Sequence, residues 1–173
     1  MGKRYVFWRD STGKPHKSLP YGSEGVEILK RYAMALDQSN MDVAFLHLWG
    51  ILEKITQTVG TSYDETVKRA VRTFSDRALA GELLEAMRLH RNRIVHAAHA
   101  GEERDQVVYL IKGFVDPHLL RLIRNDFQVE SLKEYGDQLR LPTDLKELRR
   151  RHRLVSQAIR IARNETKRSG AAH

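Results

Sequence analysis

The residues best suited to chemistry lie near the middle of the chain, where positions 91–96 read Arg-Asn-Arg-Ile-Val-His. His96 could take or give a proton, because histidine is the side chain that titrates near neutral pH. Arg91 stays charged and its planar guanidinium fits phosphate oxygens, while Asn92 could orient either side chain. These groups would suffice for metal-independent cleavage of RNA. The histidine would deprotonate a ribose 2′-OH, the alkoxide would attack the phosphorus, and the arginine would stabilise the added charge.

The helix that carries these residues decides whether they can meet. On a helical wheel Arg91 lies at the edge of the apolar stripe, and Arg88, Asn92, His96 and His99 lie on the flank beside it. Arg91 and His96 are about 140° apart at 100° per residue, so one helix does not easily aim both at one atom. The long Arg91 side chain could bend toward the histidine, or a second copy of the helix could complete the site. DNA lacks the 2′-OH and would not react by this route.

Positions 91–96 resemble the motif of the HEPN superfamily (higher eukaryotes and prokaryotes nucleotide-binding), an arginine, a polar residue, three variable residues and a histidine. The preceding segment 45–53 and the place of the motif near the end of a long helix are also similar to that family. The similarity is greatest to the Apea-like branch and covers roughly residues 23–127.

This resemblance implies a helical bundle in which Arg91 and His96 are the catalytic pair and Asn92 is their polar support. Many HEPN proteins are metal-independent endoribonucleases of toxin–antitoxin, phage-defence or RNA-processing systems. They usually form homodimers in which the two motif helices line one cleft. By this resemblance the chain would bind RNA, need no cofactor, and have an antitoxin or another regulatory protein as a further partner. The tyrosine that follows the histidine in one toxin branch is missing here, because positions 97–99 are Ala-Ala-His.

Other interpretations of these residues stay open. Arg91 could extend from the core edge, and His96 could simply stabilise a helix C-terminus. Glu53 could orient Arg91 through a bidentate pair or be a surface charge, and His99 could be a second proton donor or a surface side chain. A non-catalytic HEPN-like module that binds RNA or a protein, and a basic helical DNA-associated regulator, are the alternative functions. His90 faces the core stripe and is expected to be structural.

Positive charge is concentrated at the C-terminus. The net charge of the 173 residues is +8, with 30 Lys and Arg against 22 Asp and Glu, and most of the excess lies after residue 139. Such a segment is attracted to polyanions, most commonly nucleic acid, although it could also be a solvated helix face. Six arginines are the candidates for RNA binding: Arg149, Arg150, Arg151, Arg153, Arg160 and Arg163.

Composition excludes several classes of function. The chain has no Cys, which excludes disulfides, thiolate metal sites and a thiol nucleophile. His96 and His99 lack a nearby acidic ligand and do not predict a zinc site. Phosphate-binding, dinucleotide and metalloprotease motifs are absent. No apolar run approaches the ~20 residues of a membrane span, and no secretory signal is recognisable, so we expect no membrane partner and a cytoplasmic protein.

The periodicity predicts an all-α fold with three parts. Residues 1–22 are expected to form an extended arm or hairpin, 23–128 a HEPN-like helical bundle, and 129–173 a linker and a basic helix. Helix-start signals occur at Asn40, at Asp76, at 142–144, and at Ser62 with Glu65, which form a capping box.

Several boundaries follow from the same patterns. Gly60 should end the second helix, and the 135–137 stretch, Tyr-Gly-Asp, should interrupt the helical pattern. Two separate helices are expected at 105–112 and 117–127, with Pro117 at the first position of the second. The core stripe of the motif helix is expected to consist of Leu79, Leu83, Met87 and Ile94.

Overall fold

The structure is a computed structural model that describes residues 19–96 and 104–170, and within those ranges its regular elements are all helices. This confirms the all-α fold class. The expected N-terminal arm or hairpin lies almost entirely outside the described residues. The chain divides into two units, residues 1–139 and residues 140–173. Among the described helices, none combines the length and the apolar character needed to cross a bilayer.

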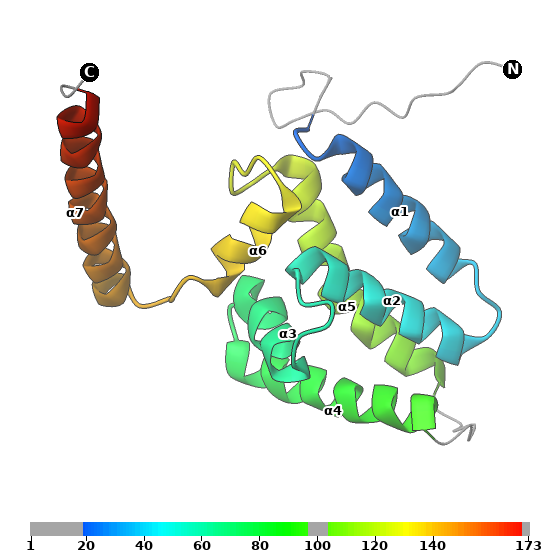
Figure 1. Cartoon of the computed structure of the whole chain (residues 1–173). Coiled ribbons are helices and arrows are strands. Elements are labelled where there is room, and N and C mark those ends of the chain that lie inside the picture. The colour runs from blue at the N-terminus through cyan, green and yellow to red at the C-terminus, as the bar shows by residue number, and fades with distance from the viewer. Residues whose placement is uncertain (1–18, 97–103, 171–173) are drawn as a thin grey trace, which may run out of the picture. The chain divides into compact units, whose positions relative to one another are not determined.

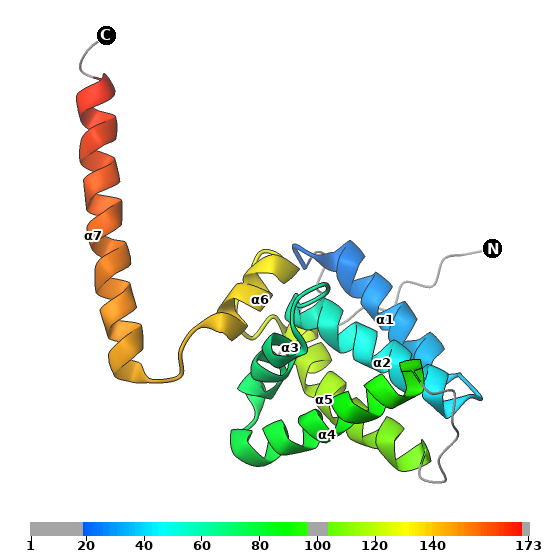
Figure 2. The ribbon, with the colours of Figure 1, turned by 60° about the horizontal axis from the view of Figure 1, so that its bottom comes forward.

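The first unit is built around α2 (Met41–Thr56), with α1 (Gly22–Leu36), α3 (Tyr63–Ala70), a short 3-10 turn η1 (Val71–Thr73), α4 (Arg77–His96), α5 (Arg104–Arg124) and α6 (Leu132–Arg140). α2 packs against α1, α3 and α5, as the views in Figures 1 and 2 both show. Its side chains Leu48, Trp49 and Leu52 are almost completely buried. The region that carries the motif is therefore supported by a hydrophobic core.

Two of the predicted helix starts are capped as expected in this unit. The Asn40 side chain accepts hydrogen bonds from the backbone N–H groups of Asp42 (3.0 Å) and Val43 (3.3 Å). Asp76 accepts one from the N–H of Leu79 at 3.0 Å. Each side chain satisfies donors that a helix N-terminus leaves unpaired.

The predicted junction between α2 and α3 is wrong in two respects. α2 ends at Thr56 with Gln57 in the left-handed conformation (φ 56°), before Gly60 is reached. Ser62 precedes α3 but makes no side-chain capping hydrogen bond. At the end of α2, the buried Arg69 donates to the backbone oxygens of Thr56 (2.9 Å) and Gln57 (3.1 Å).

The predicted core stripe of α4 is only partly correct, since Met87 and Ile94 meet the core as expected but Leu79 and Leu83 do not. Leu84 and Met87 are buried and Ile94 packs against the core, whereas Leu79 and Leu83 are 54% and 39% exposed. The helix carries two apolar stripes, and a single core can bury only one of them.

α5 is one continuous helix, so the two-helix prediction is wrong and Pro117 lies in its interior. Neighbouring contacts hold the chain helical on both sides of the proline. Asp116 accepts a hydrogen bond of 2.5 Å from the Tyr32 hydroxyl of α1 and pairs with Lys112 one turn earlier. His118 is fully buried. These contacts offset the hydrogen bond that an interior proline removes.

The predicted interruption at 135–137 is also wrong, because α6 runs through it. Tyr135 and Leu139 are buried, which places this helix in the first unit and not in the linker expected after residue 128. Gly136 allows the approach, since a Cβ at this position would lie 2.6 Å from Cβ of Gln57. Close packing therefore explains a glycine that the sequence pattern suggested was a helix breaker.

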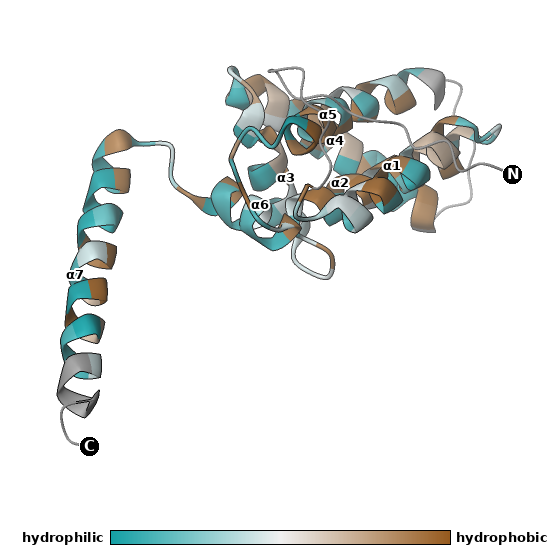
Figure 3. Ribbon diagram, turned by 90° about the horizontal axis from the view of Figure 1, so that it is seen from above, coloured by the Kyte–Doolittle hydropathy of each residue, from teal (hydrophilic) through white to brown (hydrophobic). Residues whose placement is uncertain are grey.

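The second unit contains α7 (Leu145–Gly170), which begins where predicted and extends beyond the expected end near 166. Asp144 accepts a hydrogen bond from the N–H of Glu147 at 2.9 Å and caps the helix. Hydrophobic segments recur along α7 among hydrophilic ones (Figure 3). Its apolar side chains are exposed within this unit, including Val155 and Ile159.

Candidate functional site

The site is centred on Arg91, whose side chain turns from α4 toward α3. The guanidinium carbon lies 4.8 Å from the centroid of the Tyr63 ring, an arrangement in which the ring face attracts the cation. Nη1 is 3.5 Å from Oδ1 of Asn92, a long contact with the next residue of the same helix. Arg91 is thus positioned by an aromatic face rather than by a carboxylate.

The Nε atom of Arg91 is buried and has no hydrogen-bond partner among the described residues. An N–H donor of this kind normally finds an acceptor, because leaving it unpaired costs about 1–3 kcal/mol. The acceptor of this donor must come from outside the described residues, and water, another part of the chain or an anionic ligand can supply it.

Trp49 and Glu53 of α2 extend this arrangement beyond the Tyr63 ring. The rings of Trp49 and Tyr63 meet edge to face, with centroids 6.2 Å apart and an interplanar angle of 68°. The indole N–H of Trp49 donates to Oε1 of Glu53 at 2.9 Å. Glu53, Trp49, Tyr63 and Arg91 therefore form a connected series across three helices, which we call the Arg91 cluster. Glu53 acts on Arg91 only through the two rings.

The other expected site residues are only partly brought together. Arg88 forms an ion pair with Glu85 on its own helix, with Nε 2.6 Å from Oε2. His96 is the last residue of α4, and its side chain lies outside the described residues, as does the whole of His99. The pairing of Arg91 with His96 therefore stays a prediction.

His90 packs edge-on against Phe45, with ring centroids 5.2 Å apart. Burial, together with the nearby positive charge of Arg93, lowers the pKa of His90, and Asp42 partly opposes the shift. A neutral imidazole packed on a core aromatic agrees with the structural role expected for it.

Sequence analysis missed Tyr63 as a site residue and treated it only as the residue after a cap. Its side chain is half-buried, and nothing in its spacing to Arg91 predicts that they meet. In the sequence, Tyr63 is recognisable only as a tyrosine at the first position of a short predicted helix. Tyrosines in such positions are too common to identify a site.

The outer face of α4 carries an apolar stripe that nothing in the described residues covers. Leu79, Leu83 and Leu89 lie within an arc of about 120° on the wheel, and Leu89 is 56% exposed. These side chains lie on the same helix as the motif. An exposed stripe of this kind is typical of a surface that meets another protein.

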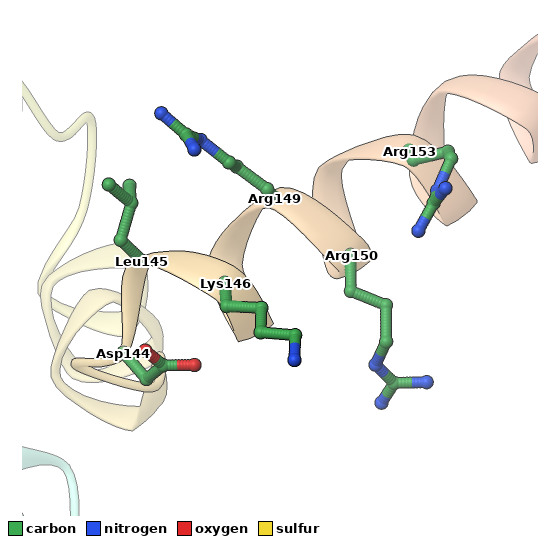
Figure 4. Close-up of a pocket in the computed structure, with 6 residues that line it drawn as sticks. All are labelled: Asp144, Leu145, Lys146, Arg149, Arg150 and Arg153. Atoms are coloured by element: carbon green, nitrogen blue, oxygen red, sulfur yellow. The ribbon is translucent and has the colours of Figure 1, made fainter.

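The basic face of α7 begins at its first turn. Figure 4 shows Lys146, Arg150 and Arg153 extending from this part of the helix, with Arg149 directed away from them. Arg150 and Arg151 both bind Glu147, at 2.8 Å and 3.1 Å, and hold the pKa of that carboxyl well below its usual range. The other predicted RNA-binding residues, Arg149, Arg153, Arg160 and Arg163, show no ion pair among the described residues.

A second polar group that sequence analysis missed lies inside the first unit. His118 is fully buried, with Nε2 2.8 Å from the carbonyl oxygen of Ala70 and Nδ1 2.8 Å from the Tyr135 hydroxyl. A carbonyl only accepts, so Nε2 carries the proton and Nδ1 accepts from Tyr135. Burial lowers the pKa of His118 to about 4. Both ring nitrogens are used internally, which makes this a structural histidine.

The described residues contain no group of three or more metal-ligating side chains, so they build no metal site. No protein-family model matches this sequence, and neither the curated proteins nor the solved structures include a significant match to it. The interpretation of the Arg91 cluster therefore depends on its own geometry and on the resemblance at positions 91–96.

Proposed function

We propose that the chain is a metal-independent endoribonuclease in which Arg91 and His96 act on the phosphodiester and Asn92 supports them. The observation that carries the proposal is the Nε of Arg91, a buried cationic donor without a partner among the described residues. A scissile phosphate would supply the missing acceptor and gain the charge of the guanidinium. His96 would take the 2′-OH proton, and the 2′-oxygen would bond to phosphorus as the P–O5′ bond breaks. The departing 5′-oxygen would take up a proton from the protonated histidine or from water, which leaves a 2′,3′-cyclic phosphate and a 5′-OH.

The proposal includes a homodimer, because one helix does not easily aim both Arg91 and His96 at one phosphate and a second copy of the helix could complete the site. The exposed stripe of Leu79, Leu83 and Leu89 lies on the motif helix and provides a surface for a second copy. Two α4 helices facing each other through this stripe would bring His96 of each subunit close to the interface, and the long Arg91 side chain would have to reach around its own helix to meet the His96 of the other subunit.

The arginines of α7 are proposed to hold the RNA through its phosphates. Arg153 and Arg160 are exposed and differ by seven residues, so they lie on one face of the helix. Contacts of this kind bind without reading sequence. A toxin or phage-defence context, and a regulatory protein that blocks the cleft, follow from the family resemblance alone.

The test is incubation of the purified protein with mixed RNA in EDTA, comparing the wild type with His96→Ala. The expected products carry 2′,3′-cyclic phosphate ends, because the 2′-oxygen is the nucleophile. His96→Ala should reduce the rate at least a hundredfold, the ordinary contribution of a general base. His47→Ala is the matched control, since His47 is an exposed histidine of α2 outside the Arg91 cluster.

A second candidate function is a non-catalytic module that binds RNA, and the basic face of α7 favours it. If the chain only binds RNA, the RNA should stay intact with the wild type and with His96→Ala. The affinity for RNA should then be the same for the two proteins. Equal cleavage by wild type and His96→Ala would reject the Arg91–His96 mechanism. Cleavage of duplex DNA would also contradict it, because DNA has no 2′-OH.

A further inference from the structure

We infer that α7 pairs with α7 of a second copy of this chain as a parallel two-stranded coiled coil. Its inner face consists of seven residues that alternate three and four apart: Leu145, Leu148, His152, Val155, Ile159, Ala162 and Thr166. This spacing is the a and d pattern of a heptad repeat, which forms a seam when two helices supercoil. We call these residues the α7 seam.

The exposed side chains of α7 leave a surface that a second copy could cover. Val155 is 57% exposed and Ile159 47% exposed, and Leu145 is also exposed. A helix of 26 residues that buries none of its apolar stripe gains little beyond its own backbone hydrogen bonds. The pairing would supply the missing burial.

Two positions of the α7 seam favour two strands, whereas Leu145 at an a position and Val155 at a d position have the opposite residue types. Leu148 occupies a d position and the β-branched Ile159 an a position, the combination typical of parallel dimers. His152 occupies an a position between apolar layers. A single polar residue there fixes the register, because a shifted pairing would place it against an apolar side chain.

The charges beside the α7 seam favour the parallel orientation. In a parallel pair each g position lies near the e position of the next heptad on the other helix. Asp144 would then lie beside Arg149 of the second copy, Arg151 beside Ser156, and Arg163 beside Ala158. No like charges meet in these pairs.

An antiparallel pair would place e positions on the same side of the interface, where Arg149 and Arg163 repel. Four other basic residues, Lys146, Arg150, Arg153 and Arg160, occupy b and f positions, which lie away from the α7 seam. Their mutual repulsion is screened at physiological salt, where the Debye length is about 8 Å.

The inference can be tested by disulfide cross-linking, because the chain has no cysteine and a single introduced thiol is then the only one present. Val155→Cys in the full-length, nuclease-treated protein places one thiol at a d position, where the two copies of a parallel pair face each other. Mild oxidation should give a disulfide-linked dimer at least ten times faster than for Leu154→Cys. Leu154 is the matched control, since it is 51% exposed and lies one residue away but outside the α7 seam.

Equal rates for the two cysteine variants would overturn the inference. A Val155→Cys thiol that is protected from alkylation while the protein stays monomeric would also overturn it, because α7 would then be covered by its own chain. Preferential linkage between Leu148→Cys and Ile159→Cys in a mixture would reject the parallel orientation, because a d position faces an a position only in an antiparallel pair. Val155→Lys should weaken association and His152→Ile should strengthen it. None of these measurements depends on RNA cleavage, so the result is separate from the proposed function.

Discussion

The guanidinium of Arg91 rests on the face of Tyr63, with 4.8 Å between its carbon and the ring centroid. This contact joins α4 to α3 and sets the direction in which the cation points. Replacement of Tyr63 by a smaller side chain should therefore alter catalysis without removing any residue that contacts the phosphate.

Tyr63→Leu is expected to reduce the rate of RNA cleavage about tenfold, which corresponds to the 1–2 kcal/mol of a partly desolvated cation–π contact. Tyr63→Phe keeps the ring and its edge contact with Trp49, so it should remain near the wild-type rate. The measurement is the initial rate on a fluorescent RNA in EDTA, with thermal unfolding of each variant as the control for folding. A Tyr63→Phe variant as slow as Tyr63→Leu would indicate that the hydroxyl, and not the ring face, is what matters.

The buried pair of His118 and Tyr135 predicts a loss of stability in mild acid. His118 has its pKa lowered to about 4 in the folded protein, whereas an unfolded histidine titrates near 6.5. Below pH 6.5 the unfolded chain binds the additional proton, so the free energy of unfolding should fall as the pH drops toward 4. The loss from this residue approaches about 3 kcal/mol at the lower end of that range.

Urea denaturation at pH 7.0 and pH 5.0 measures this effect. His118→Gln removes the titrating group, and the difference in unfolding free energy between the two pH values should become smaller. His47→Gln is the control, because His47 is exposed and should leave the difference unchanged. An unchanged pH dependence in His118→Gln would mean that other groups cause the acid sensitivity.

Gly136 and Gly113 should respond in opposite directions to the same substitution. A Cβ at Gly136 would lie 2.6 Å from Cβ of Gln57, so Gly136→Ala should destabilise the protein by about 1–3 kcal/mol through overpacking. Gly113 lies in α5 with nothing within 4 Å of an added Cβ. Gly113→Ala should stabilise it by roughly 0.5–1 kcal/mol, because alanine is the better helix former. Chemical denaturation of both variants tests the close approach of α6 to α2.

The features that sequence analysis predicted correctly are the local ones. The caps at Asn40, Asp76 and Asp144 form because each side chain reaches donors only two or three residues away. The errors arise where distant residues decide the outcome. α6 continues through Gly136 because Gln57 packs there, and α5 continues through Pro117 because contacts on both sides hold it.

The candidate site divides in the same way. The motif predicted Arg91 as a candidate site residue, which stays a prediction, and the wheel placed it at the core edge, where it lies. Tyr63 and the route from Glu53 through Trp49 could not be predicted, since they depend on how α2, α3 and α4 pack. The outward face of Leu79 and Leu83 was missed because a hydrophobic pattern does not say whether the core or another subunit covers it.

A cleft shared between two subunits predicts that two inactive variants rescue each other. In a mixture of Arg91→Ala and His96→Ala, a mixed dimer has one cleft with both wild-type residues and one with neither. About half of the dimers are mixed and each has one active cleft, so about a quarter of the wild-type activity should return. Adding Leu89→Lys to both variants should abolish the rescue, because it places a charge on the exposed α4 stripe.

The rescue is measured as RNA cleavage after subunit exchange, with each inactive variant alone as the baseline. Activity that stays at the baseline in the mixture would place Arg91 and His96 of a single subunit in each cleft. Rescue that survives Leu89→Lys would locate the subunit contact elsewhere on the first unit.

The arginines of α7 should differ in their effect on RNA binding although they carry the same charge. Arg150 and Arg151 are neutralised in part by Glu147, whereas Arg153 and Arg160 have no ion pair among the described residues. The double variant Arg153→Ala/Arg160→Ala should therefore weaken RNA binding more than the double variant Arg150→Ala/Arg151→Ala. Both variants lose two positive charges. If both side chains contact phosphates of single-stranded RNA, the slope of log affinity against log salt should fall by about 1.4. Fluorescence anisotropy from low to physiological salt measures both quantities, and equal slopes for wild type and both double variants would show that α7 does not contact the RNA backbone.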